Sequence, residues 1–349
     1  MFSVSLWLKL VPMKNFEDKI GHPSQLGGIE TSVLDNGAGR GVRIAWINTG
    51  SGLRYKVVID RAMDVAETFY NQHGLAWISK AGIRPPETAA FVGLEWLRNW
   101  GGGLVTTCGI SYMGSPESDE NGVRGLHGRI SNLAAEIVSI IQPDPENGKM
   151  DFSITGIMRE SGVFGPHLEL ERTISGTLGV PEIRISDRVT NRGNSTAPHM
   201  LLYHLNMGWP LIDKGTQLNW KGKWQSRGND LDNEIFHEGG TFRECQEPMD
   251  SHHDGGEACA FIDIEPDAAG NCVCSAVNPT LGIGLEISFK KEQLPWLINW
   301  QHWGKGEYVT ALEPATNLTV GQSDARTNGS LIILRPGENR EYELKLRMC

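Results

Sequence analysis

Apolar residues fall at every second position in several segments spread along the chain. The alternation is clearest in residues 42–46, 183–189, 283–289 and 342–346. Successive side chains of a strand point to opposite faces, so a period of two indicates strands with one apolar and one polar face. The 42 glycines and 17 prolines of the chain supply turns between such strands. The pattern predicts an all-β protein built from large antiparallel sheets.

The strand pattern runs through the chain without a mid-chain linker or an internal repeat, which favours one large sandwich over alternating strands and helices. We therefore expect a single domain over residues 1–349, with a leading segment at 1–20. One helix is expected at residues 85–100. Two prolines open this segment, apolar residues recur in it at every third position, and Gly101–Gly103 follow it.

The charge balance and the length of the apolar runs argue against two classes of partner, nucleic acids and membranes. The chain has 32 Lys and Arg against 42 Asp and Glu, and no basic run, so a nucleic-acid partner is not expected. The longest apolar runs, such as residues 137–141, are far shorter than the roughly 18 residues of a membrane-spanning helix, so no membrane partner is expected either. Six cysteines are too few for a disulfide scaffold, and no signal sequence is recognisable; reduced thiols and a cytoplasmic location are expected.

Neither a cofactor nor a metal ion is expected. The glycines at 37–41 lead into a strand and those at 101–103 follow a helical pattern, so neither group presents a helix N-terminus to a phosphate. The pair Cys272 and Cys274 lacks the two-residue gap of a zinc knuckle, and His252-His253 has only Cys259 nearby.

Three polar clusters stand in apolar or glycine-bounded surroundings. His127 and Arg129 share one face of a strand expected at 125–130, and His204 and Asn206 share one face of a strand expected at 201–206. Glu313 is embedded in the apolar segment 310–314, where burial would raise its pKa and prepare it to act as a base. Each cluster alone is better explained by a hydrogen bond in the core. Together they supply the parts of a general acid–base site.

Two further features suit either structure or ligand binding. Arg61 stands between Asp60 and Asp64 at the end of a strand, where a structural ion pair and a substrate contact are equally plausible. The chain has eleven tryptophans, and several of them, Trp300 included, are near the polar clusters in sequence. Flat rings of this kind suit the C–H faces of a sugar, although burial in a core is their usual role.

These motifs, in this order and spacing, resemble the aldose 1-epimerase (galactose mutarotase-like) superfamily, and more closely its DUF4432 branch. The segments that carry the resemblance are 60–65, 102–109, 126–129, 202–208 and 312–314. The resemblance implies a β-supersandwich whose concave face holds a sugar. It also implies a mutarotase reaction without cofactor, in which Glu313 takes the proton of the anomeric hydroxyl and His204 protonates the ring oxygen. His127 and Arg61 resemble the residues of the family that bind substrate hydroxyls.

The sequence departs from the family pattern at one of these positions. The mid-chain histidine of the mutarotases stands four residues before an asparagine, whereas His204 stands two residues before Asn206. An offset of two keeps the strand face but moves the ring by roughly 7 Å along the strand. His127 is therefore a second candidate for the general acid. Arg129, Asn206, Trp300 and His302 are further candidates for contacts with the sugar.

Three functions are consistent with the sequence. The first is a cofactor-independent mutarotase, or aldose 1-epimerase, that acts through Glu313 and His204 on a small-molecule sugar. The second is a carbohydrate-binding protein without catalytic activity. The third is an isomerase or lyase of uronic acids, which would use Arg61 and Arg129 to hold the sugar carboxylate. The identity of the sugar and the oligomeric state are left open by the sequence.

Overall fold

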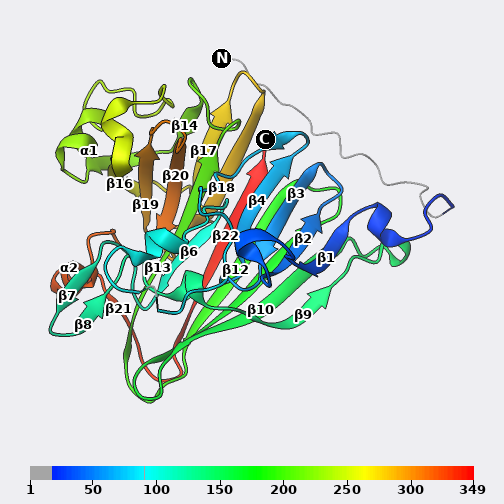
Figure 1. Ribbon diagram of the computed structural model, residues 1–349, viewed down its shortest axis with the longest axis horizontal. Helices are drawn as coiled ribbons and strands as arrows, with labels where there is room; N and C mark the ends of the chain where they lie inside the picture. Colours follow the sequence, from blue (N-terminus) through cyan, green and yellow to red (C-terminus); the bar gives the residue numbers. More distant parts are fainter. Residues whose placement is uncertain (1–17, 90) are drawn as a thin grey trace.

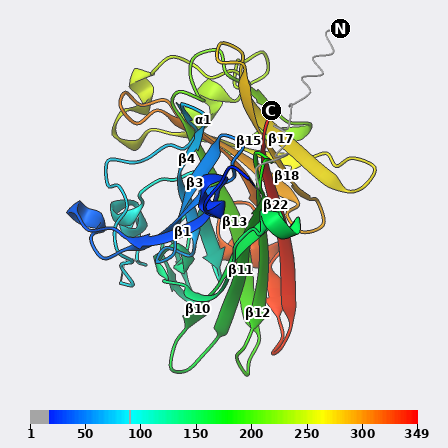
Figure 2. The same ribbon diagram turned by 90° about the vertical axis from the view of Figure 1, so that its right-hand side faces the viewer.

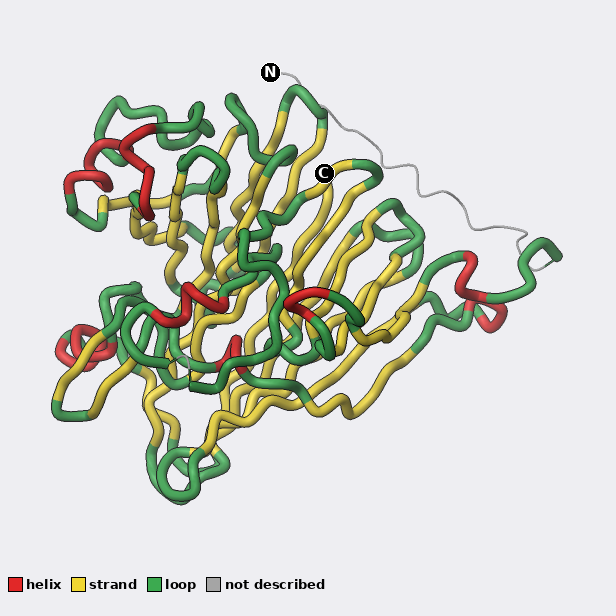
Figure 3. Tube along the Cα trace, in the orientation of Figure 1, coloured by secondary structure: helices red, strands yellow, loops and turns green. Residues whose placement is uncertain are grey.

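The computed structural model describes residues 18–89 and 91–349, so residues 1–17 of the expected leading segment lie outside it. Strands dominate the described residues, and the helices are few and short (Figure 3). The strands form antiparallel sheets of five, eight, seven and two members (Figure 1). The all-β class expected from the alternation is confirmed.

The sheets are assembled from the following strands. The five-stranded sheet contains β1 (Gly28–Val33), β2 (Arg43–Asn48), β3 (Leu53–Val58), β4 (Asp64–Tyr70) and β5 (His73–Gly74). The eight-stranded sheet contains, in spatial order, β14 (Gln217–Asn219), β17 (Asn271–Asn278), β18 (Ile283–Lys290), β22 (Asn339–Met348), β12 (Glu182–Asn191), β11 (His167–Thr177), β10 (Asp151–Ser161) and β9 (Glu136–Ile141). The seven-stranded sheet contains β15 (Gly222–Ser226), β16 (Ala258–Ile264), β19 (Trp296–His302), β20 (Val309–Ala315), β13 (Ala197–Gly208) and β21 (Ile332–Leu334), and β6 (Thr106–Ile110) pairs with β13.

The remaining elements are short. The strands β7 (Glu117–Asp119) and β8 (Gly122–Arg124) form a separate hairpin. The α-helices are α1 (Asp230–Ile235) and α2 (Gln322–Thr327). The 3-10 helices are η1 (Pro23–Gln25), η2 (Gly37–Gly39), η3 (Glu95–Asn99), η4 (Ile130–Asn132), η5 (Pro145–Asn147) and η6 (Asp250–Gly255). No helix among the described residues is long and apolar enough to cross a membrane.

The strands bury the side chains that the period of two assigns to the core. Along β11 every second side chain is buried and the others are partly exposed. In β12 the buried set includes Ile183, Ile185 and Val189, as the alternation predicts. The long strands β10, β11, β12 and β22 lie side by side in one layer (Figure 2). The inner faces of the large sheets share one apolar cluster, which is the main core of the molecule.

Backbone hydrogen bonds join the start of β4, in the five-stranded sheet, to the residue before β6, in the seven-stranded sheet. Val65 of β4 and Val105, which directly precedes β6, exchange both backbone hydrogen bonds, at 3.1 and 2.9 Å. Close approach there requires a residue without a side chain at position 103, because a Cβ on Gly103 would stand 2.8 Å from the carbonyl oxygen of Val65. The connection joins β4 to β6 and, through β6, to β13.

A buried ion-pair network lies in the core at this junction. Arg172 of β11 is fully buried and donates two hydrogen bonds to Asp187 of β12, at 2.8 and 2.6 Å. Its third donor group contacts Asp64 of β4 at 3.3 Å and Thr107 of β6 at 2.7 Å. Tyr203 of β13 donates to Asp187 at 2.7 Å. One guanidinium therefore ties together strands of all three large sheets.

The helix expected at residues 85–100 is not present in the structure. Only the five-residue 3-10 helix η3 forms there. Spacing by three matches the three residues per turn of a 3-10 helix, which is seldom longer than one turn. Leu94 and Leu97 remain 59% and 47% exposed, whereas Trp96 and Trp100 are buried, so the apolar residues of this segment do not form one face.

We predict that Arg172→Met destabilises the protein strongly. The substitution leaves the carboxylates of Asp187 and Asp64 buried without their cation, which costs about 3–5 kcal/mol. The matched control is Arg188→Met on β12, because Arg188 and Glu341 form an ion pair whose side chains are both more than half exposed. Such an exposed pair contributes little to stability, because solvent screens it. Urea denaturation of both variants measures the difference, and equal losses of stability would contradict the role given to the buried network.

Candidate active site

A cavity of about 590 Å³ lies over the seven-stranded sheet, on the face opposite to the main core. Its floor is formed by the strands β13, β16, β19 and β20. Its walls come from η3, α1 and the end of η6 with their flanking residues, and from the loop segments at 114–116, 126–127 and 319. The lining residues are Leu94, Trp96, Leu97, Trp100, Gly114, Ser115, Pro116, Leu126, His127, His204, Arg227, Asn229, Leu231, Gly255, Glu257, Cys259, Ile298, Trp300, Glu313 and Thr319.

Strand register brings His204 and Glu313 together on this floor. The pairs Leu202↔Ala315 and Leu205↔Leu312 of β13 and β20 place position 313 beside position 204. Glu313 in turn lies opposite Ile298 of β19. Within β13, Leu202 belongs to the apolar cluster beneath the cavity, whereas Tyr203 and Leu205 belong to the main core. The alternation of β13 therefore turns His204 toward the cavity, on the strand face that the sequence predicted.

The two side chains are in contact and almost fully buried. Nε2 of His204 lies 3.3 Å from Oε1 of Glu313. Burial raises the pKa of Glu313 well above its ordinary value, as the sequence predicted, and the nearby carboxylate of Glu257 raises it further. Burial also lowers the pKa of His204 well below its ordinary value. Both shifts favour the uncharged pair, a carboxylic acid beside a neutral imidazole, in which the carboxyl group holds the one transferable proton.

His127 is the third titratable group on the cavity wall. The strand expected at 125–130 is not formed; His127 lies in a turn with a positive φ of 57°. This conformation is uncommon for a residue with a side chain and is found most often where structure is held for function. Two backbone hydrogen bonds fix it, from the amide of His127 to Gly114 at 2.9 Å and from Gly109 to the carbonyl of His127 at 3.0 Å.

The His127 ring faces the Glu313–His204 pair. Its centroid lies 5.7 Å from that of His204 and 4.8 Å from that of Trp96. Burial lowers the pKa of His127 to about 4, so the ring is neutral at physiological pH. Its Nδ1 atom has no hydrogen-bond partner among the described residues. This nitrogen is a buried polar atom beside the cavity.

Tryptophan rings enclose the acid–base pair. The centroids of Trp100 and Trp300 lie 5.1 and 5.3 Å from that of His204. Trp300 donates to Oε2 of Glu257 at 2.6 Å, which fixes its indole. The two indoles are also neighbours, with centroids 6.0 Å apart, and provide adjacent apolar surfaces beside His204.

Two charged residues in the cavity, Arg227 and Glu257, were not predicted from the sequence. Arg227 lines the wall, forms two hydrogen bonds with Asp232 at 3.0 and 2.9 Å, and donates to Glu257 at 2.7 Å. Asp232 is fully buried and also accepts from the amide of Cys259 at 2.8 Å. Arg227 and Glu257 lie in loop segments without periodicity, so no sequence pattern could have identified them.

Two of the predicted arginines lie elsewhere. Arg61 does not line the cavity; its guanidinium donates to the carbonyl oxygens of Ser131 and, at 2.9 Å, of Asn99. It borders a separate void of about 30 Å³. Arg129 lies over the ring of Phe91 at 4.7 Å and borders a different surface depression.

Two other predicted residues lie behind the cavity. Asn206 is fully buried and donates to the carbonyl oxygens of Gly103 and His204, at 2.9 and 3.0 Å. His302 stacks on Trp300, with ring planes 8° apart, and contacts Gly256 and Glu307 at 2.6 and 3.3 Å. Both residues support those that line the cavity. Within residues 18–89 and 91–349, no group of three or more His, Cys, Asp and Glu side chains is placed to hold a metal ion.

Comparisons with known proteins extend over most of the chain. The profile of the family described as "Domain of unknown function (DUF4432)" matches residues 39–348. A candidate aldose 1-epimerase from Klebsiella pneumoniae has a similar structure, with a TM-score of 0.80 and 22% identity over 92% of this chain and 83% of that one. A galactose mutarotase-like protein from Clostridium acetobutylicum and galactose 1-epimerase from Lactobacillus acidophilus align with TM-scores of 0.61 and 0.59. Their identities are 10% and 9%, and each alignment covers 92% of this chain and 98% of the other. No curated protein matches the sequence.

These similarities support the fold. At identities this low they carry no activity over to this chain. The galactose mutarotase-like sandwich expected from the sequence is confirmed.

We predict that Glu313→Gln raises the melting temperature at pH 8 but not at pH 4. Below the ordinary glutamate pKa of 4.5, Glu313 is protonated in both folded and unfolded chains. Above that pH the unfolded chain ionises this group while the folded protein keeps it neutral, so the wild type loses stability as the pH rises. A neutral amide removes that loss. The control is Glu146→Gln at an exposed site, which should shift the melting temperature equally at both pH values, and the same behaviour in Glu313→Gln would contradict the raised pKa.

Proposed function

We propose, from the premise that this chain belongs to the DUF4432 family, that it is a cofactor-independent aldose 1-epimerase. The observation that carries the proposal is the buried contact between Glu313 and His204 on the floor of a cavity large enough for a sugar. Two titratable groups in contact, both with pKa values shifted by burial, can act as a general acid and a general base.

The proposed reaction moves two protons and breaks one bond. The Glu313 carboxylate takes the proton of the anomeric hydroxyl, the C1–O5 bond breaks as the C1 carbonyl forms, and His204 gives its proton to O5. The open-chain aldehyde then rotates about its C1–C2 bond. The same steps in reverse close the ring on the other face of C1 and return both protons, so the pair is unchanged at the end of the cycle.

The number of transferable protons that Glu313 and His204 hold together suits this sequence of steps. The reactive pair, a carboxylate and an imidazolium, holds the same single transferable proton as the neutral pair favoured by burial. Transfer of that proton from Glu313 to His204 across 3.3 Å converts one state into the other without uptake from solvent. After ring opening the pair is neutral again, which is the state that burial stabilises. Each positioned group of this kind typically accelerates a reaction by roughly 10²–10⁴-fold.

The charges around the cavity favour a neutral sugar over a uronic acid. A sugar carboxylate would need an available cation. Arg61 and Arg129, which the uronic-acid hypothesis requires, do not line the cavity. Arg227 does, but it is already bonded to Asp232 and Glu257. A neutral sugar could hydrogen-bond to Glu257 and the His127 ring, which both line the cavity, while its C–H faces lie against Trp100 and Trp300.

We predict that the wild type accelerates anomer exchange of at least one neutral aldose and that Glu313→Gln abolishes this exchange. Loss of the base removes the first proton transfer, whereas the similar shape of glutamine leaves the cavity intact. Saturation-transfer NMR across a panel of aldoses and uronic acids measures exchange, and ligand-observed NMR on the same samples measures binding. Binding without acceleration in the wild type would instead support the carbohydrate-binding function. Acceleration confined to uronic acids would support the third hypothesis.

We predict a different kinetic effect for each histidine. His204→Asn should lower kcat by roughly 10²–10⁴-fold, because it removes the general acid. His127→Asn should mainly raise KM, because it removes a contact with a hydroxyl group. Measurement of both constants by NMR exchange at several sugar concentrations separates the two roles. A large loss of kcat in His127→Asn with little loss in His204→Asn would reverse the assignment of the acid.

A further inference from the structure

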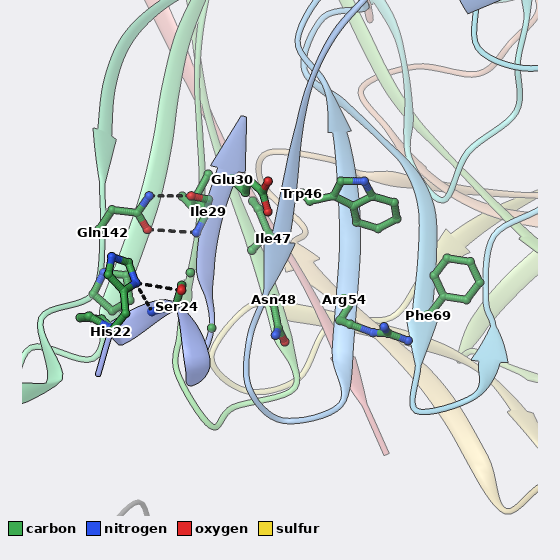
Figure 4. Close-up of a pocket in the computed structure, with 14 residues that line it drawn as sticks. His22, Ser24, Ile29, Glu30, Trp46, Ile47, Asn48, Arg54, Phe69 and Gln142 are labelled. Carbon is green, nitrogen blue, oxygen red and sulfur yellow. Dashed lines mark hydrogen bonds between the residues drawn. The ribbon is translucent and has the colours of Figure 1, made fainter. Parts of the chain in front are cut away.

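A second cavity, of about 790 Å³, lies on the five-stranded sheet and shares no residue with the cavity at Glu313 (Figure 4). It is bordered by η1, by the strands β1 to β4 and by the segment after β9. Its lining residues are His22, Pro23, Ser24, Gly27, Gly28, Ile29, Glu30, Trp46, Ile47, Asn48, Arg54, Phe69, Gln142 and Pro143. The proposed epimerase reaction has no use for this cavity.

Strand register arranges the side chains of this cavity in two rows. Asn48, Arg54 and Phe69 are direct cross-strand partners on β2, β3 and β4. Glu30 and Trp46 are partners on β1 and β2, two residues further along β2. Residues directly opposite one another share a face of the sheet, so both rows point to the same side. Ile29 and Ile47, which alternate with them, belong to the main core.

Two aromatic rings form a fixed surface in these rows. The side chains of Trp46 and Phe69 are partly exposed. The Lys56 ammonium lies 5.0 Å from the centroid of the Trp46 ring and is held there by an ion pair with Glu67 at 2.5 Å. Because Trp46 is on β2 and Phe69 on β4, their backbone positions are two strand spacings apart, about 10 Å, and are also offset by two residues, roughly 7 Å, along the strands. The pair spans more than one sugar ring.

The wall beside β1 is closed by a side chain. The amide of Gln142 accepts from the backbone amide of Ile29 at 3.0 Å and donates to the Ile29 carbonyl at 2.6 Å, as Figure 4 shows. It therefore occupies the backbone groups through which β1 could pair with another strand at this point. Gly28 leaves space in the cavity next to Gln142, because a Cβ at position 28 would stand 2.8 Å from the Gln142 side-chain oxygen.

The polar groups of the cavity carry opposite charges that are not paired with each other. Glu30, Asn48 and Arg54 are exposed. Within the described part of the chain, no ion pair involves Glu30 or Arg54, and the Arg54 guanidinium donates only to the carbonyl of Asn71, at 3.3 Å. Arg54 and Glu30 together carry no net charge, and neither does the Lys56–Glu67 ion pair beside Trp46. The two rows offer both donors and acceptors beside aromatic faces, which suits an uncharged ligand with hydroxyl groups and C–H faces.

We propose that this second cavity, the groove along β1 to β4, is a binding site for a neutral oligosaccharide. Two sugar rings of the oligosaccharide lie against Trp46 and Phe69, and its hydroxyl groups bond to Arg54, Asn48 and Glu30. The site is separate from the Glu313 cavity and does not depend on the epimerase proposal. A phosphate-bearing ligand such as a nucleic acid is disfavoured by the Glu30 carboxylate.

The test is calorimetric titration of the full-length protein with four neutral tetrasaccharides: cellotetraose, maltotetraose, xylotetraose and mannotetraose. We expect at least one to bind, and Trp46→Ala to weaken its affinity by about tenfold or more, as loss of a central aromatic contact commonly does. Arg54→Gln should weaken the same binding. The matched control is Phe164→Ala, since Phe164 is an aromatic residue outside the groove that is 94% exposed. The Phe164→Ala variant should bind the tetrasaccharide as tightly as the wild type does.

Glu313→Gln separates the two sites. Oligosaccharide affinity should be unchanged in this variant, and anomer exchange should be unchanged in Trp46→Ala. The proposal is overturned if none of the four tetrasaccharides binds to the wild type. It is also overturned if Arg54→Gln and a folded Trp46→Ala, checked by circular dichroism, both bind as tightly as the wild type. Loss of tetrasaccharide binding in Glu313→Gln would assign that binding to the first cavity and overturn the second site.

Discussion

The buried guanidinium of Arg172 is the interaction on which the arrangement of the large sheets depends. It bonds to Asp187 and Asp64 and, with Thr107 and Tyr203, connects strands of all three. A fully buried charge is tolerated only when its donors are satisfied, so this set of contacts fixes how the sheets meet. Tyr203 faces this network, and the next residue, His204, faces the cavity on the other side of β13. The core contact thus positions the candidate catalytic residue.

The Glu313–His204 pair differs from the Arg172 network in how its charge is balanced. Glu313 and His204 are buried, but no cation neutralises the carboxyl group by direct contact, so burial shifts both pKa values toward the uncharged forms. The shift lowers the stability of the folded protein above the ordinary pKa of glutamate, and it provides a proton that can move between two sites. The Arg227–Glu257 pair in the same wall is satisfied internally and leaves the cavity without an available cation. The buried charge of Arg172 is thus paired and stabilises the fold, whereas the carboxyl group of Glu313 has no paired cation and has a shifted pKa.

The sequence by itself determined the strands and singled out Glu313 and His204 as candidate residues, which the structure places in contact. Alternation in β11, β12 and β18 is a local property, because the backbone geometry of a strand sends neighbouring side chains to opposite faces. The same rule identified the cavity-facing side of β13, and an apolar context identified Glu313 as a group with a raised pKa. His127 was found from its glycine-bounded motif, although the motif forms a turn in place of a strand. These features depend on residues that are neighbours along the chain.

Only the tertiary structure decided which distant residues meet. Arg61 bonds to carbonyl oxygens far along the chain, and Asp64, its neighbour in sequence, pairs instead with Arg172. Arg227 and Glu257 reach the cavity from irregular loops, and Arg129 does not reach it. The segment at 85–100 buries Trp96 and Trp100 against the site and forms one short helical turn, because contacts with the seven-stranded sheet outweigh its local spacing. Long-range packing and the pairing of buried charges cannot be inferred from periodicity, since they depend on the relative placement of whole sheets.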